Sequence, residues 1–167
     1  IAPEVVAEKH NISFIECESD LDIDDSCDIY LILGAGILSE QCVENKKIIN
    51  AHPGIIPACR GLDSFKWAIY KDIPIGNTLH YIDKNVDSGE IISVIPTTVY
   101  KTDSLETLSR RHYENEIKML SSFEVYLKNP VNSYSEIQSG EPTMRMSTEI
   151  ETKMVRMFDK YVEKWGQ

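Results

Sequence analysis

The sequence predicts an α/β protein whose mostly parallel sheet is flanked by helices. Strand-like and helix-like segments alternate as far as residue 72, which is the element order of a parallel α/β sheet. The run DIYLILGAG at residues 28–36 is almost continuously apolar and ends in a glycine-rich stretch, a pattern typical of a buried parallel strand. The chain has 167 residues, 42% of them apolar, which is enough to build one domain around a core.

The first part of the chain is expected to contain three strands and three helices. An acidic stretch at 18–27 should be a solvated loop, because it lacks the glycine and the final glutamate of a calcium loop. In the third helix Phe65, Ala68 and Ile69 would share one face. The predicted order is helix 2–10, strand 12–17, strand 28–33, helix 38–45, strand 46–52 and helix 63–72.

The second part is expected to add a pair of strands and two long helices. Strands 76–83 and 90–99 are joined by a short loop, so they should form a hairpin-like addition to the sheet. The longest helix should cover 104–128, with Asp103 as its N-cap. After an irregular stretch rich in Ser, Pro and Asn, an amphipathic helix should cover 148–165.

Composition and charge argue against several classes of function. The formal net charge is −10, and proteins that grip nucleic acid usually present a basic surface, so no nucleic-acid partner is expected. No apolar run approaches the roughly 18 residues of a membrane span, so no membrane association is expected. The cysteines form no Cys-x-x-Cys pair, which indicates reduced thiols in the cytoplasm and no metal site.

Polar side chains are found where the predicted strands end. Asn50 and His52 are two residues apart on strand 46–52, so both should point to the same face. The loop 83–90 follows another strand and carries Asp87, and α/β folds place their sites in such loops. An amide, an imidazole and a carboxylate at one edge would hold an oxyanion, move a proton and orient the imidazole, which is the chemistry of acyl transfer. Taken singly, each residue is explained as well by ordinary strand-end and turn structure.

The stretch from Ile48 to Ile92, IINAHPGIIPACRGLDSFKWAIYKDIPIGNTLHYIDKNVDSGEII, resembles the signature of the folate-dependent formyltransferases. The family pattern is Asn-x-His-Pro, a short apolar pair and Pro, then Arg-Gly or Lys-Gly, a helix, Gly-x-Thr-x-His and Asp-x-Gly-x-Ile. Every fixed point occurs in order, namely at Asn50, His52, Pro53, Pro57, Arg60, Gly61, Gly76, Thr78, His80, Asp87, Gly89 and Ile91. A weaker resemblance covers residues 1–128 and implies a Rossmann-like sheet.

The resemblance implies an enzyme that moves a formyl group from N10-formyltetrahydrofolate to the amine of a small acceptor, without a metal. By position, Asn50 would hold the oxyanion, His52 would carry the proton and Asp87 would assist through His52 or a water. The folate pocket would use Gly34, Ala35, Gly36, Ile37, Leu38, Val86 and Asp87. The acceptor would contact Pro53, Gly54, Arg60, Gly61 and His80.

Several alternatives stay open on sequence grounds. The acceptor is expected to be an amino-sugar nucleotide or glycinamide ribonucleotide, because the acidic charge disfavours transfer RNA. The same three side chains would suit a formyltetrahydrofolate hydrolase, and a folate-binding module without activity is a further alternative. A homodimer is also left open.

The resemblance also suggests how the chain is divided. Residues 1–128 would form the catalytic domain, and residues 129–167 would form an extension that ends in a helix and packs on, or extends, the same domain. The family's first strand and its glycine-rich loop precede the part that residue 1 matches. The sheet is therefore expected to lack the first strand or strands at its N-terminal side.

Overall fold

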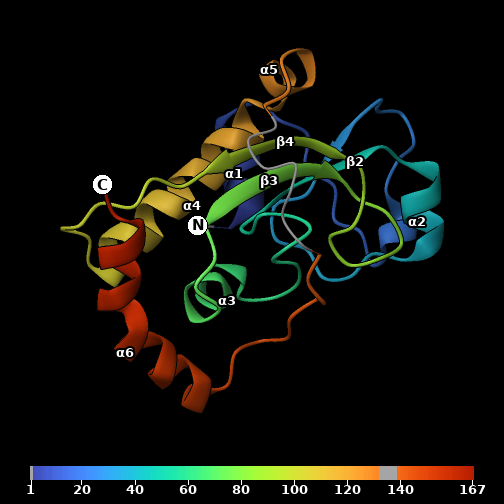
Figure 1. The fold of residues 1–167 in the computed structure, drawn as a ribbon. Coiled ribbons are helices and arrows are strands. Elements are labelled where there is room, and N and C mark those ends of the chain that lie inside the picture. Colours follow the sequence, from blue (N-terminus) through green and yellow to red (C-terminus); the bar gives the residue numbers. More distant parts are fainter. Residues whose placement is uncertain (1, 132–138) are drawn as a thin grey trace.

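The computed structural model describes residues 2–131 and 139–167, and Figure 1 shows helices arranged around one sheet. The strand order is β1 (Tyr30–Leu31), β2 (Ile48–His52), β3 (Gly76–Tyr81) and β4 (Ile91–Pro96). β1 and β2 run parallel, whereas β2–β3 and β3–β4 are antiparallel pairs, the second being the expected hairpin-like pair. The α/β class with flanking helices is confirmed, and the sheet formed by the described residues is mixed.

Helices precede, separate and follow the strands. α4 packs against β2 and β3, while α3 and α6 pack on each other. The bounds are α1 (Pro3–Lys9), the short 3₁₀ helix η1 (Asp20–Asp22), α2 (Glu40–Asn45), α3 (Ser64–Tyr70), α4 (Leu105–Ser121), α5 (Phe123–Lys128) and α6 (Thr148–Trp165).

Two buried apolar clusters hold the sheet and these helices together. The first includes Ile69 of α3 and Leu108 of α4 and extends onto α6. The second includes Ile49 of β2, Leu79 of β3 and Met119 of α4. Burying a side chain of this size stabilises a fold by about 1.5–3 kcal/mol. β2 and β3 are therefore held firmly against α4.

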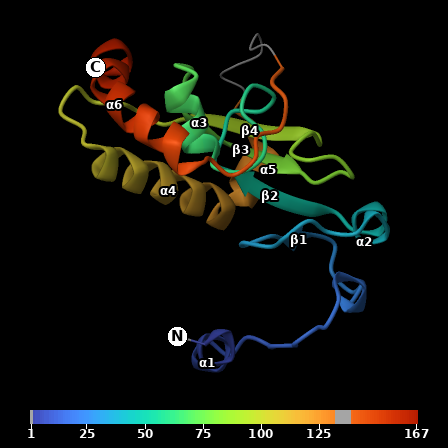
Figure 2. The same cartoon turned by 90° about the horizontal axis from the view of Figure 1, so that it is seen from below.

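The N-terminal arm, residues 2–37, differs from the rest of the fold. Figure 2 shows α1 and the chain that follows it standing apart from the other helices, and only Ala7 of this arm is buried. The strand predicted at 12–17 is wrong, since no strand in the described part of the chain pairs with it. Phe14 and Ile15 remain exposed there. A strand needs a hydrogen-bonding neighbour, which the residue pattern alone cannot supply.

The run 28–36 forms a shorter and more exposed strand than its composition predicts. Pairing with β2 is limited to Tyr30 and Leu31. Leu31 is exposed, and 82% of the surface of Leu33 is accessible, so the prediction of a buried strand is wrong. β1 has one neighbouring strand among the described residues, which leaves its other edge uncovered.

The single helix predicted over 104–128 is two helices. The break falls at Ser122, whose φ of −114° and ψ of 22° leave the helical range. α5 then begins at Phe123, and both Phe123 and Leu127 pack on the second cluster. The change of direction thus keeps the apolar side of the second segment on the core.

The N-cap of α4 is Ser104 rather than Asp103. The Ser104 hydroxyl accepts a hydrogen bond from the Thr107 backbone N–H at 3.2 Å, and the Thr107 hydroxyl accepts one from the Ser104 backbone N–H at 3.0 Å. Asp103 instead accepts two hydrogen bonds of 2.7 Å from Arg111, which lower its pKa to about 2. Asp103 is thus engaged by Arg111, while Ser104 caps the helix.

Candidate functional site

The end of β2 places Asn50 and His52 beside β3. His52 is buried, with 3% of its surface accessible, and Asn50 is half-buried. The antiparallel register sets Asn50 opposite His80, and Asn50 Nδ2 lies 3.4 Å from His80 Nε2. The rings of His52 and His80 meet edge to face with centroids 6.3 Å apart. Two histidines and one amide therefore share this end of the two strands.

Asp87 reaches the same point from the loop between β3 and β4. Its Oδ2 lies 3.4 Å from His52 Nδ1, and its Oδ1 lies 3.7 Å from His80 Nε2. The backbone N–H of Gly61 donates to Asp87 Oδ2 at 2.7 Å. Asp87 also has a positive φ of 45°, a strained conformation that folds tend to keep where function needs it. The structure thus brings Asn50, His52, His80 and Asp87 together.

Backbone carbonyls fix how the two rings are oriented. His52 Nε2 lies 2.9 Å from the Cys59 carbonyl, and His80 Nδ1 lies 2.9 Å from the Tyr81 carbonyl. A carbonyl oxygen only accepts, so each of these nitrogens carries the ring proton. The opposite nitrogens, His52 Nδ1 and His80 Nε2, are left with lone pairs that face Asp87 and Asn50.

Burial dominates the electrostatics of the cluster. Loss of solvation lowers the pKa of His52, although the nearby carboxylate of Asp87 acts in the opposite direction. Burial also lowers the pKa of His80, and the neighbouring His52 lowers it further. Both imidazoles are therefore neutral near pH 7 and available to take up a proton.

Close packing behind His52 requires glycine at position 54. A Cβ on Gly54 would lie 2.7 Å from His52 Nε2 and 2.4 Å from the Cys59 carbonyl oxygen. Thr78 holds the same loop, because its hydroxyl donates to the Gly54 carbonyl at 2.7 Å and accepts from the Ile56 N–H at 3.1 Å. This turn is accordingly tight and well supported.

A segment distant in sequence covers the loop that follows. Residues 139–147, here called the C-terminal strap, run along residues 57–63. Gly140 N–H donates to the Pro57 carbonyl at 2.8 Å, and Thr143 N–H donates to the Arg60 carbonyl at 2.9 Å. Gly61 has a φ of +87°, and a Cβ there would lie 2.3 Å from the Thr143 carbonyl oxygen. The strap thus holds the loop that supplies the N–H bound to Asp87.

The remaining residues expected to contact an acceptor lie around this cluster. The guanidinium of Arg60 donates to the Gly140 carbonyl at 3.0 and 3.1 Å, so part of its bonding capacity is used within the chain. The Pro53 carbonyl lies 3.2 Å from Nε2 of the buried His112. Burial lowers the pKa of His112 to about 4, so this nitrogen donates to Pro53 from a neutral ring. Arg60 and Pro53 therefore both make contacts within the chain.

The expected folate loop belongs to the N-terminal arm rather than to the cluster. Gly34, Ala35 and Gly36 are exposed, Ile37 is 94% exposed, and Leu38 is half-buried. Among the described residues, no hydrogen bond joins this loop to the cluster. Val86, beside Asp87, is 43% exposed. The structure therefore keeps residues 34–37 and Val86 at the surface, whereas Leu38 is half-buried and Asp87 belongs to the cluster.

Sequence reasoning missed two buried contacts of the cluster. Ser64 and the Cys59 carbonyl both lie beside His52 Nε2, at 3.0 and 2.9 Å. Ser64 reads as an ordinary helix residue, and a carbonyl contact depends on how the loop 53–63 folds back. No sequence signal within the chain marks either contact.

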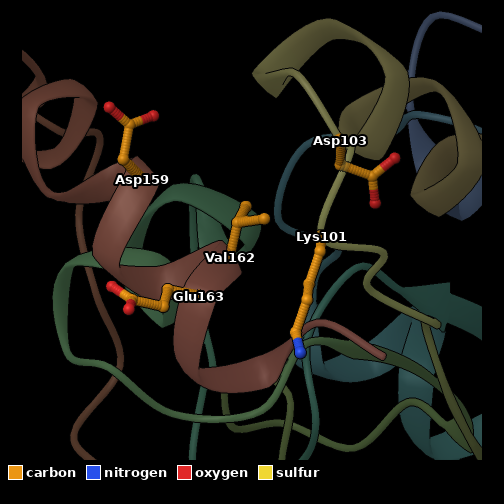
Figure 3. Close-up of a pocket in the computed structure, with 5 residues that line it drawn as sticks. All are labelled: Lys101, Asp103, Asp159, Val162 and Glu163. Carbon is orange, nitrogen blue, oxygen red and sulfur yellow. The ribbon is translucent and has the colours of Figure 1, made fainter.

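Other features of the described residues point to no second centre. They contain no group of three His, Cys, Asp or Glu side chains placed to hold a metal ion. No described helix is long and apolar enough to cross a membrane. A cavity of about 350 Å³ lies between α6 and the segment before α4, lined by Lys101, Asp103, Asp159, Val162 and Glu163 (Figure 3). None of these five residues belongs to the cluster around His52.

The comparison with protein families gives one match that covers this region. A family described as "Formyl transferase" matches residues 29–123, more than half of the chain. The matched residues extend from β1 to the start of α5 and include the whole cluster. The match therefore rests on the part of the molecule that the geometry singles out.

A curated relative agrees with that match over a shorter stretch. Phosphoribosylglycinamide formyltransferase of Bacillus subtilis (strain 168) is 36% identical over 77 residues, which cover 46% of this chain and 40% of the relative. This chain thus spans less than half the length of that relative.

Two solved structures resemble the chain over most of its length. A 4-N formyltransferase from Francisella tularensis has a TM-score of 0.66 at 18% identity, covering 91% of this chain and 69% of that one. The formyltransferase PseJ from Anoxybacillus kamchatkensis, in complex with UDP-4,6-dideoxy-4-formamido-L-AltNAc and tetrahydrofolate, has a TM-score of 0.65 at 22% identity. That alignment covers 99% of this chain and 94% of the other. At these identities the likeness establishes the fold.

Proposed function

Because the chain belongs to the formyl transferase family, we propose that it moves a formyl group from N10-formyltetrahydrofolate to a primary amine. The observation that carries this proposal is the meeting of Asn50, His52, His80 and Asp87 at one end of β2 and β3. The reaction joins the acceptor nitrogen to the formyl carbon, breaks the bond from that carbon to N10, and transfers one proton from the acceptor to N10. The residues must therefore hold an oxyanion and carry a proton.

Asn50 supplies the oxyanion contact. Its amide carries two N–H donors, and one of them faces the lone pair of His80 Nε2 at 3.4 Å. The second donor remains for the oxygen of the tetrahedral intermediate. A single donor of this kind is worth about 3–4 kcal/mol in other acyl transfers. His80 thus orients the amide of Asn50, since its own Nδ1 is committed to the Tyr81 carbonyl.

His52 and Asp87 move the proton. The Nε2 proton of His52 is held by the Cys59 carbonyl, so Nδ1 is the nitrogen that can accept the proton of the attacking amine. Asp87 Oδ2 lies 3.4 Å from Nδ1 and stabilises the imidazolium that results. The lowered pKa of His52 favours return of this proton to N10 as tetrahydrofolate departs.

Partial exposure indicates how substrates would reach these groups. The two histidines are buried, whereas Asn50 is half-buried and 16% of the Asp87 side chain is accessible. Substrates would therefore approach from the side of Asn50 and Asp87. Val86 and Ile37 are exposed apolar side chains suited to packing against a flat pterin ring, in keeping with their proposed place in the folate pocket.

The acceptor is proposed to be a small phosphorylated or nucleotide-linked amine. The curated relative is a phosphoribosylglycinamide formyltransferase, while the PseJ complex contains a formamido sugar linked to UDP. A net charge of −10 fits small acceptors better than nucleic acid. A screen should offer amino-sugar nucleotides and glycinamide ribonucleotide with the folate donor. Mass spectrometry would detect transfer as a gain of about 28 Da, because a formyl group replaces one amine hydrogen.

Replacement of His52 tests the assignment directly. We expect His52→Ala to lower kcat/KM by about 10²–10⁴-fold, since the proton carrier is lost. The matched control is His10→Ala, which changes an exposed histidine of the N-terminal arm and should leave the rate unchanged. A near-wild-type rate in His52→Ala would remove His52 from the mechanism.

Two further outcomes of the same assay would redirect the proposal. Fast release of tetrahydrofolate without any amine would identify a hydrolase. Binding of a stable folate analogue by calorimetry, with no turnover for any acceptor, would identify a folate-binding module.

A further inference from the structure

Ser64, the first residue of α3, contacts the candidate site although no catalytic role is assigned to it. Its side chain is fully buried, and its Oγ lies 2.8 Å from the Gly61 carbonyl and 3.0 Å from His52 Nε2. The carbonyl can only accept, so the single hydroxyl proton of Ser64 goes to Gly61. The Ser64 oxygen therefore presents a lone pair to His52.

His52 Nε2 consequently faces two acceptors, the Ser64 oxygen and the Cys59 carbonyl, at 3.0 and 2.9 Å. On the other side of the ring, Nδ1 lies 3.4 Å from Asp87 Oδ2, longer than the roughly 2.7–2.9 Å of a charge-assisted hydrogen bond. The distances thus favour a proton on Nε2 over one on Nδ1.

These contacts close into a ring. Gly61 accepts from Ser64 through its carbonyl and donates to Asp87 Oδ2 through its N–H at 2.7 Å. Asp87 Oδ2 in turn faces His52 Nδ1, and His52 Nε2 returns to Ser64. One residue, Gly61, therefore contacts two of the groups that face His52, namely Ser64 and Asp87. A change at Ser64 would be felt by the imidazole and by the loop that holds Asp87.

We propose that Ser64 is a positioning residue that, together with the Cys59 carbonyl, keeps the proton of His52 on Nε2 and so leaves Nδ1 as the atom that exchanges protons. The consequence for turnover rests on the proposed formyl transfer, whereas the tautomer itself is a property of the chain alone. Without the Ser64 oxygen, the Cys59 carbonyl alone would face Nε2, and the charged Asp87 would draw part of the ring-proton population toward Nδ1.

Nuclear magnetic resonance of ¹⁵N-histidine-labelled protein tests the tautomer without any substrate. At about pH 8, where the imidazoles are neutral, long-range ¹H–¹⁵N correlations distinguish a protonated from an unprotonated ring nitrogen. The His52 signals are assigned by their loss in His52→Gln. We expect Nε2 to be protonated and Nδ1 bare in the wild-type chain. A bare Nε2 would overturn the proposal, and this measurement needs no Ser64 variant to fold.

Ser64→Ala then tests whether Ser64 decides the tautomer. We expect a new population of His52 protonated on Nδ1, and an unchanged spectrum would overturn the proposal. Ser64→Thr keeps the hydroxyl and should restore the wild-type tautomer. The matched control is Ser93→Ala, because Ser93 is also fully buried and accepts from the Val131 N–H but belongs to β4, outside the ring of contacts.

Turnover gives a second readout in the wild type and these variants. We expect Ser64→Ala to lower kcat by up to about 100-fold with little change in KM, the pattern of a misplaced proton carrier. The pH profile of kcat should also shift, because the tautomer determines which nitrogen of His52 takes up the proton. The titratable groups that face His52 are Asp87, His80 and the more distant His112. An unaltered kcat and pH profile in a variant with a changed tautomer would refute the catalytic part. If the wild type transfers no formyl group, only the proposed function fails, since the tautomer stands on the spectrum.

Discussion

The N-terminal arm and the half of the molecule around β2 and β3 differ in how they use apolar residues. The arm, residues 2–37, buries only Ala7 and leaves large hydrophobic side chains such as Ile15 and Leu33 at the surface. The other half packs its hydrophobic residues into two clusters and brings four polar side chains together. The proposed proton chemistry therefore lies in this well-packed half, called the rigid half below.

The difference explains where each part of the proposed function resides. Asn50, His52 and His80 stand on strands packed against α4, and Asp87 reaches them from the loop between β3 and β4. The expected folate loop, 34–38, stands on the arm, where little packing defines its position. The expected folate loop and the cluster around His52 thus stand on different halves of the molecule, and substitutions in the two halves should behave differently.

A pair of leucines would show the largest contrast. Leu108 on α4 is 0% exposed, whereas Leu33 on the arm is 82% exposed. We expect Leu108→Ala to lower the free energy of unfolding by about 2–5 kcal/mol, because it removes buried contacts and leaves a cavity. Leu33→Ala should change it by no more than about 0.5 kcal/mol. Urea unfolding measures both, and equal effects would contradict the division into two halves.

Acid stability should reveal the buried histidines of the rigid half. Burial lowers the pKa of His112 from 6.5 to about 4. Between these values the unfolded chain binds more protons than the folded one, so the free energy of unfolding falls as the pH falls. This one group accounts for about 3 kcal/mol, lost between about pH 6.5 and pH 4. The lowered pKa values of His52 and His80 act in the same direction.

Urea unfolding over a pH series checks this expectation. His112→Gln should give a shallower loss of stability toward acid than the wild type. The exposed His10 of the arm provides the control, and His10→Gln should leave the slope as it is. Identical slopes for wild type and His112→Gln would show that His112 is not the group responsible.

Two glycines should show the smallest difference in stability between the two halves. One of them, Gly54, lies directly behind His52. A Cβ at Gly54 would collide with the Cys59 carbonyl and His52, whereas a Cβ at Gly36 on the arm would have no atom within 4 Å. We expect Gly54→Ala to cost about 1–3 kcal/mol of stability and to reduce formyl transfer. Gly36→Ala should be neutral or stabilising by up to about 1 kcal/mol. Tolerance of Gly54→Ala would mean that the turn behind His52 is less tightly packed.

The sequence was informative where structure depends on local periodicity. The two-residue repeat of a strand correctly placed Asn50 and His52 on one face, and the loop after a strand correctly brought Asp87 to them. It failed where distant partners decide. Residues 12–17 have a strand-like pattern but no neighbouring strand in the described part of the chain. The contact of Ser64 with His52 depends on a folded loop, and composition carries no trace of it.

The ends of the helices were also difficult to predict from sequence alone. Asp103 and Ser104 are both good capping residues, but in the fold Asp103 is bonded to Arg111, eight residues further on, and Ser104 is the cap. The break at Ser122 likewise follows from the position of the second cluster rather than from any helix-breaking residue.

The C-terminal strap is synthesised after the loop that it holds. Thr143 and Met146 bind the loop around Gly61 and Asp63 from about eighty positions downstream. A nascent polypeptide that has left the ribosome only as far as residue 131 already contains both histidines and Asp87, yet nothing from the strap holds their supporting loop. Synthesis therefore delivers the proposed reactive groups before the strap that holds their supporting loop.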